Sequence, residues 1–164
     1  MGIGVQLVFP LIHTLLLLLI FYLLNASMLY LLKSHFPSPS LFVAYKFEAS
    51  DQTVVVTGDT MYSDGLIDFS KGADLVVMDG MLTELKEEDP FYDEFQRIKP
   101  QLASAHITLE EIGQILAKAN VKKVVLTHLM NGEMDKQRTT QILRYEGYEG
   151  GVIIAETNGK YEVE

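Results

Sequence analysis

Apolar positions divide the chain into two unlike parts. Residues 1–32 contain no Asp, Glu, Lys or Arg, and an unbroken apolar run extends from Leu15 to Leu24. The segment from Leu11 to Leu32 is long enough to cross a hydrocarbon core, which takes about 20 helical residues. It is apolar all round rather than along one stripe, and this favours lipid over a protein core. The pattern predicts one continuous membrane helix over residues 11–32, within an apolar segment, 1–33, that precedes the domain.

Two other interpretations of the apolar segment stay open. The small residues Asn25–Ser27 are typical of a signal-peptide cleavage site, but the amino end carries no Lys or Arg. The segment is otherwise a buried core segment or the product of a shifted or truncated reading frame. A membrane anchor followed by Lys33 would place the domain in the cytoplasm. The signal-peptide interpretation predicts a secreted or periplasmic protein, and the third interpretation predicts a soluble one.

Short β-rich runs alternate with helical patterns after a Pro- and Ser-containing linker at 34–40. The fully apolar runs Leu75–Met78 and Val124–Thr127 predict neighbouring central strands of a sheet that is covered on both faces. Thr108 and Glu111 form a capping box that predicts the start of a helix. Strands alternating with helices predict an α/β layered domain over residues 34–164. Further expected elements are a hairpin of strands 41–48 and 53–57, helices near 91–98 and 136–145, and a final strand pair, 152–155 with 160–163.

Charge and cysteine content exclude several classes of function. The formal net charge is −9, which argues against a nucleic-acid partner held mainly by a basic surface. The chain has no Cys, so disulfides, thiolate metal ligands and a cysteine nucleophile are all excluded. Any metal site in this chain is therefore built from imidazole and carboxylate groups.

Candidate chemistry lies at the ends of strands and at one helix entrance. Asp59 follows the run Val54–Gly58, and His128 follows Val124–Thr127 in the same way. His35 and His106 precede a predicted strand and a predicted helix. Strand ends are where α/β sheets display ligands, and imidazole with carboxylate suits Zn²⁺. The alternative is that these are scattered polar residues of an ordinary sheet.

Four motifs carry a resemblance to a known family. They are Thr57–Thr60, Gly72–Val77, Ala105–Thr108 and Val121–Leu129. In this order they resemble the carboxyl-terminal half of the metallo-β-lactamase superfamily. The most similar branch holds tRNA 3′-processing endonucleases and arylsulfatase- or lactonase-like hydrolases. The resemblance implies half of an αββα sandwich over residues 34–164, preceded by the apolar helix.

The resemblance also implies roles for single residues. Asp59 matches the aspartate that bridges two zinc ions, and His128 matches the last histidine ligand. His35 matches the histidine ligand that precedes an aromatic strand. His106 matches a histidine close to the scissile group that assists proton transfer or stabilises an oxyanion. The implied site holds one or two zinc ions in a complete family member.

The sequence departs from the family pattern in one respect. The first metal motif, His-x-His-x-Asp-His, is absent from the chain. A two-metal hydrolase needs both ions to activate water and hold the reacting group. We therefore expect zinc binding to be weak or absent, and the chain to be incomplete or inactive alone.

Two hypotheses of function follow. In the first, a partner chain supplies the missing half, and zinc-activated water hydrolyses a small-molecule phosphodiester, ester or lactone. In the second, the chain is a non-catalytic, membrane-tethered remnant or binding module derived from that fold. A reading frame for the missing motif directly upstream would distinguish them.

Overall fold

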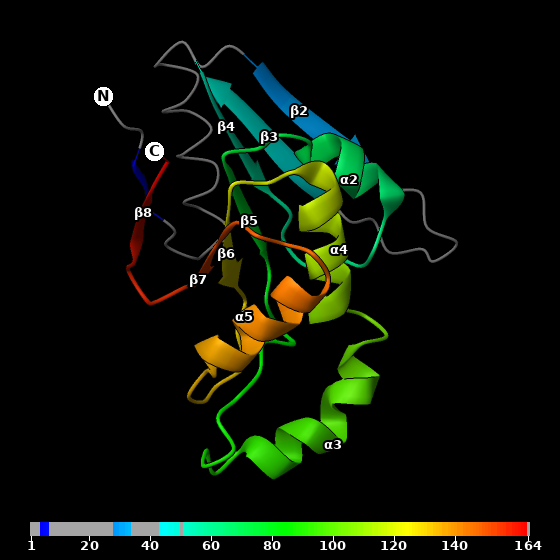
Figure 1. The fold of residues 1–164 in the computed structure, drawn as a ribbon, viewed down its shortest axis with the longest axis vertical. Helices are drawn as coiled ribbons and strands as arrows, with labels where there is room; N and C mark the ends of the chain where they lie inside the picture. The colour runs from blue at the N-terminus through cyan, green and yellow to red at the C-terminus, as the bar shows by residue number, and fades with distance from the viewer. Residues whose placement is uncertain (1–3, 7–27, 34–42, 50, 164) are drawn as a thin grey trace.

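The computed structural model describes residues 4–6, 28–33, 43–49 and 51–163. Their main feature is a six-stranded sheet with the strand order β2-β3-β4-β5-β6-β7 (Figure 1). The strands are β2 (Met28–Lys33), β3 (Val43–Ala49), β4 (Gln52–Val56), β5 (Leu75–Asp79), β6 (Lys123–Thr127) and β7 (Gly151–Ile154). Strand β3 is antiparallel to both of its neighbours, whereas β4 to β7 run parallel. The carboxyl ends of four strands therefore meet at one edge of the sheet.

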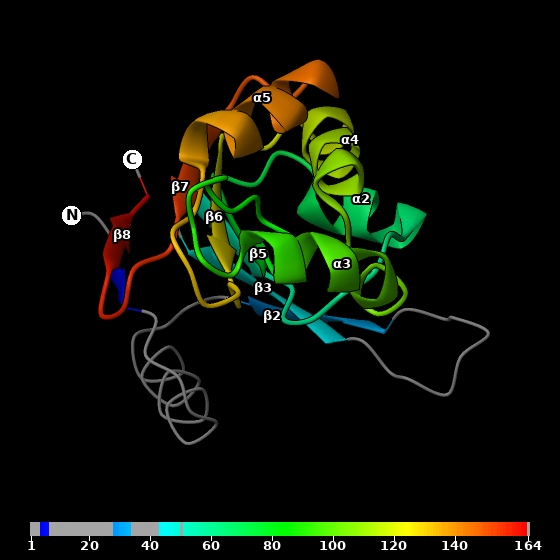
Figure 2. The same cartoon turned by 90° about the horizontal axis from the view of Figure 1, so that it is seen from below.

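Helices cover one face of this sheet. They are α2 (Asp64–Ser70), α4 (Leu109–Ala119) and α5 (Lys136–Tyr145) (Figure 2). Helix α3 (Tyr92–Leu102) lies apart from them, at the lower end of the molecule in Figure 1. Ile112, Leu116 and Val124 belong to the large core cluster between the helices and the sheet. Alternate strand residues, including Leu75, form a smaller cluster on the opposite face, as the two-residue period of a strand requires.

The predicted elements of residues 75–145 are confirmed. Strands β5 and β6 are parallel neighbours in the sheet, with Val76 opposite Val124. Helix α4 begins with the capping box of Thr108 and Glu111 and ends at Asn120, which adopts a left-handed conformation with φ 53°. The helix expected near 91–98 extends through Pro100 to Leu102, and α5 covers the predicted range. The hairpin of β3 and β4 is also confirmed, with Ala49 opposite Gln52.

The pairing of the last two strands was predicted wrongly. Strand β8 (Lys160–Glu162) does not pair with β7 but forms a two-stranded antiparallel sheet with β1 (Gly4–Gln6). Strand β7 instead extends the main sheet beside β6, with Ile154 opposite Leu126. The turn at Asn158 is present, but the chain after it leads to a different partner. Helix α2 was not predicted, because Asp64–Ser70 is short and carries only a weak apolar pattern.

The predicted continuous helix over residues 11–32 is wrong at its carboxyl end. Residues Met28–Lys33 form strand β2, which pairs with β3 in antiparallel register, Met28 opposite Glu48. A run of apolar residues this short does not distinguish strand from helix by periodicity. The sheet thus includes residues before position 34, and the rest of the predicted helix, 7–27, lies outside the described residues. Among the described residues, no helix has the length and hydropathy needed to cross a membrane.

Candidate metal and proton-transfer site

Three parallel strands bring polar side chains to one edge of the sheet. Asp59 follows β4, Asp79 is the last residue of β5, and His128 follows β6. Gly80 lets the ends of β5 and β6 approach closely: its N–H donates to the Thr127 carbonyl at 2.6 Å, and a Cβ at this position would lie 2.8 Å from the same oxygen. The close approach of β5 and β6 therefore fixes the distance between Asp79 and the segment that carries His128.

Asp79 lies at the centre of the site and is fully enclosed. Its side chain has 0% exposure, and its two oxygens accept hydrogen bonds from the backbone N–H groups of Thr60 at 3.3 Å and Met81 at 3.0 Å. The Nδ1 atom of His106 lies 2.8 Å from Oδ2 of Asp79. A buried carboxylate with these donors is held in one orientation, because every shift would leave a donor unpaired.

His106 is positioned by the segment that leads into α4. Its backbone N–H donates to the Leu102 carbonyl at 2.9 Å, and the next N–H, of Ile107, donates to the Thr60 carbonyl at 2.8 Å. An ionised carboxylate only accepts hydrogen bonds, so the contact with Asp79 places the imidazole hydrogen on Nδ1. The other ring nitrogen, Nε2, is then the atom left to exchange a proton.

The second pair, Asp59 and His128, is more open. Oδ1 of Asp59 lies 2.9 Å from Nδ1 of His128, and the side chains are 60% and 38% exposed. His128 has a φ of 56°, a left-handed conformation that costs free energy in a residue with a Cβ. The positive φ of Gly58, 61°, turns the chain just before Asp59. Backbone strain of this kind concentrates where the direction of a side chain matters for function.

The two pairs are in contact with each other. Nδ1 of His128 lies 3.5 Å from Oδ1 of Asp79, and the rings of His106 and His128 have centroids 5.3 Å apart. Asp79, His106 and His128 each offer one ligand atom, and these atoms lie within 4.8 Å of one another. Imidazole nitrogens and carboxylate oxygens at such distances fit the ligand preferences of a zinc ion. The cluster therefore fits zinc by the chemistry of its donors, and His128 is the member that also contacts Asp59.

The predicted site residues are brought together in part. Asp59, His106 and His128 converge at one sheet edge, as expected, with His106 just before the helix that Thr108 caps. His35 lies outside the described residues. Asp79 was not predicted, although a signal was present: it ends an apolar strand in the same way that Asp59 and His128 follow theirs.

Comparisons with known proteins place these residues in a family. Residues 23–129 match the family model described as a beta-lactamase superfamily domain. The chain is 30% identical over 112 residues to ribonuclease Z of Haloferax volcanii, a match that covers 68% of this chain and 32% of that protein. The residues matched by the family model include Asp59, Asp79 and His106, and His128 lies near the end of the matched range.

Solved structures show the same fold. The metallo-β-lactamase fold protein YhfI of Bacillus subtilis superposes with a TM-score of 0.60 at 24% identity, covering 82% of this chain and 48% of that one. The zinc-bound PqqB of Methylobacterium extorquens gives 0.54 at 16% identity, covering 81% and 46%. The long form of RNase Z from yeast gives 0.55 at 15% identity, covering 90% and 19%. The chain spans half or less of the length of each of these relatives.

Proposed function

The chain belongs to the metallo-β-lactamase superfamily, and from this membership we propose that it carries the carboxyl-terminal part of a metal-dependent hydrolase site for ester, lactone or phosphodiester bonds. One observation supports the proposal above all: an exposed Asp59–His128 pair with a 2.9 Å contact lies beside an enclosed Asp79–His106 pair with a 2.8 Å contact. A ligand-binding pair next to a proton-transfer pair is the arrangement that hydrolysis at a metal requires.

Asp59 and His128 are proposed to hold the metal, with His35 as a further ligand. Both side chains are accessible, and no hydrogen bond from a backbone N–H to either is found among the described residues, so an ion could bind both in place of their 2.9 Å contact. Bound zinc supplies a nucleophile at neutral pH by lowering the pKa of a bound water, and it polarises the bond that is cleaved. The family membership and the zinc-bound relative PqqB support zinc as the ion.

His106 is proposed as the proton-transfer residue and Asp79 as its positioning residue. Three of the acceptor positions on the Asp79 carboxylate are already used by Thr60, Met81 and His106. Asp79 is therefore better suited to orient an imidazole than to bind an ion. Held through Nδ1, His106 presents an unprotonated Nε2 to the reacting group, where it would take up a proton from the attacking water and then pass that proton to the leaving oxygen.

A partner polypeptide is proposed to complete the site. The chain contains no His-x-His-x-Asp-His motif, and Asp59, His128 and His35 alone leave an ion mostly hydrated. The net charge of −9 supports a small-molecule ester or phosphodiester as substrate rather than RNA. We expect the 164-residue chain alone to bind zinc weakly and to hydrolyse generic substrates near background.

The experiment measures metal content and turnover of the purified chain, alone and mixed with a polypeptide that carries the missing motif. The substrates are a chromogenic phosphodiester and a chromogenic ester. We expect zinc binding and turnover to rise on mixing, and Asp59→Ala or His128→Ala to abolish the gain. Asp68→Ala removes an exposed carboxylate of α2 whose side chain makes no hydrogen bond or ion pair among the described residues, and it should leave the gain intact.

Two results would contradict the proposal. Tight binding of two zinc ions by the chain alone, with turnover sensitive to Asp59→Ala, would show that no partner is needed. Metal binding on mixing without any turnover would favour the alternative function, a binding module that has kept the fold but not the reaction.

A further inference from the structure

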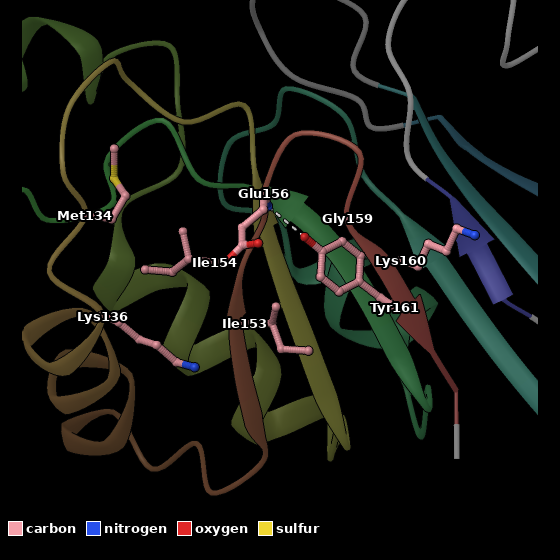
Figure 3. Close-up of a pocket in the computed structure, with 8 residues that line it drawn as sticks. All are labelled: Met134, Lys136, Ile153, Ile154, Glu156, Gly159, Lys160 and Tyr161. Atoms are coloured by element: carbon pink, nitrogen blue, oxygen red, sulfur yellow. Dashed lines mark hydrogen bonds between the residues drawn. The ribbon is translucent and has the colours of Figure 1, made fainter.

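A hollow lies near the edge of the sheet that carries Asp59, Asp79 and His128. It is a hollow of about 440 Å³ between α5, β7 and β8, here called the β7–β8 hollow. Ile153 and Ile154 of β7 and Met134 give it an apolar lining (Figure 3). Lys136 lies on the α5 side and Tyr161 on the β8 side, with Ile153 between them (Figure 3). None of the residues assigned to metal binding or proton transfer lines this hollow.

Sheet register places the hollow next to His128. Ile154 is opposite Leu126, and the N–H of Ala155 donates to the Leu126 carbonyl at 2.8 Å. His128 and Glu156 each follow two residues after this register pair. Adjacent strands lie about 4.8 Å apart, so the hollow opens roughly one strand spacing from the backbone that carries the metal ligand. The hollow and His128 therefore lie at the same end of two neighbouring strands.

The polar groups of the hollow favour an anion. Its charged lining residues are Lys136, Glu156 and Lys160, and the Lys160 side chain extends away from Ile153, on the far side of Tyr161 (Figure 3). Within the described part of the chain, the Lys136 ammonium makes no ion pair. The Tyr161 oxygen accepts a hydrogen bond from the Glu156 backbone N–H at 2.7 Å, which leaves its own hydrogen for a ligand. One ammonium and one phenol beside an apolar floor fit an apolar group that ends in a negative charge.

We propose that the β7–β8 hollow binds the part of the substrate remote from the scissile bond, and that this part is an apolar chain or ring bearing a carboxylate or phosphate. The apolar body packs on Ile153 and the Tyr161 ring, and the anionic oxygens contact Lys136 and the Tyr161 hydroxyl. The link to a substrate rests on the hydrolase function proposed above. The binding of the anion itself does not.

The experiment measures binding of octanoate, octyl phosphate and neutral 1-octanol to the full chain by NMR titration without added metal. We expect at least one of the two anions to bind with a dissociation constant about 10-fold lower than that of octanol, because only an anion makes the charged contact with Lys136. Whichever anion binds more tightly identifies the preferred head group. Lys136→Gln should remove this preference, and Tyr161→Phe should weaken anion binding about 3-fold, with each variant first checked for an unchanged melting curve.

Lys118→Gln is the matched control, because Lys118 is an exposed helical lysine without an ion pair among the described residues and lies on α4. It should leave anion binding unchanged. Equal affinity for octanol and both anions, or a Lys136→Gln variant that binds the anion as the natural chain does, would overturn the proposal. Because the titration needs neither metal nor turnover, its failure is distinct from a failure of the proposed hydrolase function.

Discussion

The two ends of strand β5 each carry an aspartate, and the two aspartates are used in opposite ways. At the amino end, Asp74 accepts the backbone N–H of Thr53 at 2.7 Å and pairs with the Lys122 ammonium at 2.6 Å. At the carboxyl end, Asp79 accepts two backbone N–H groups and faces two imidazoles, those of His106 and His128. One end is closed by the ammonium group of a lysine, whereas the other is closed by two imidazole rings.

The difference follows from the direction of the parallel strands. Asp74 lies where strands enter the sheet, on the side away from the helix and strand ends that carry His106 and His128. There, Asp74 links the beginnings of β4, β5 and β6 through the Thr53 N–H and the Lys122 ammonium. Both of its carboxylate oxygens are used by these contacts. Catalytic and ligand-binding groups of α/β sheets lie at the opposite edge, where strands end. We infer that Asp74 serves stability and that Asp79 serves the orientation of His106.

The largest expected effect is that of removing the buried aspartate at the carboxyl end. Asp79→Ala leaves the N–H groups of Thr60 and Met81 and the ring of His106 without their acceptor. Each buried unpaired backbone donor costs about 1–3 kcal/mol, so the loss of the acceptor for two of them should lower the free energy of unfolding by about 2–6 kcal/mol. Urea denaturation of the variant and of the natural chain measures the difference.

Asp59→Ala is the comparison variant for this prediction. Asp59 is 60% exposed and contacts only His128 among the described ionisable partners, so its removal should change the unfolding free energy by no more than about 0.5 kcal/mol. Equal losses in the two variants would show that the enclosed and the open pair do not differ as described.

A smaller effect is expected from the helix cap that follows His106. Thr108→Ala removes the side-chain acceptor for the Glu111 N–H and breaks the capping box of α4. Loss of such a cap costs about 1 kcal/mol in unfolding free energy. We also expect greater amide hydrogen exchange at His106 and Ile107, because the cap fixes the segment that joins α3 to α4. Thr108→Ser keeps the acceptor and should restore both properties.

Features that depend on residues close together in the sequence were predicted, whereas those that depend on distant residues were not. Helix α4 was predicted from residues three positions apart, and β5 and β6 from apolar runs whose pairing follows from the α/β pattern. Asp59 and His128 were predicted to converge because both follow strands and match metal ligands of the family. Asp79 ends an apolar strand in the same way, but its contact with His106, 27 residues away, could not be inferred from that local pattern.

Pairing at the edges of the fold was the least predictable feature. Lys160–Glu162 has the pattern of a strand, but a pattern of two-residue period does not identify the partner strand. Its partner, β1, is near the other end of the chain. The apolar pattern of Met28–Leu32 is equally consistent with a strand and with a helix. Its pairing with β3 identifies it as a strand.

The ion pair at the amino end of β5 provides the next test. Asp74→Ala removes the acceptor for the Thr53 N–H and leaves Lys122, whose side chain is 68% exposed, in solvent. Because water replaces the lysine partner, the unfolding free energy should fall by only about 1 kcal/mol, less than for Asp79→Ala. Lys122→Met removes the other partner and should cost less still. A loss at Asp74 larger than that at Asp79 would reverse the roles assigned to the two ends of the strand.

The smallest expected effect is the pH dependence that Asp74 contributes. Burial by itself raises the pKa of this carboxyl, but the hydrogen bonds from Lys122 and the Thr53 N–H outweigh it and hold the pKa below its ordinary value of 3.8. A group whose pKa is lower in the folded state stabilises the fold above its unfolded pKa and loses that contribution as the pH falls through the folded value. The Asp74→Asn variant should therefore be less stable than the natural chain at pH 7, and this difference in stability should become smaller below about pH 4. Thermal melts at pH 7, 5, 4 and 3 measure the gap, with Asp68→Asn as the exposed control for which no such narrowing is expected. A stability difference that stays constant from pH 7 to pH 3 would show that the Lys122 contact does not favour the ionised carboxylate. The ion pair would then not stabilise the amino end of β5.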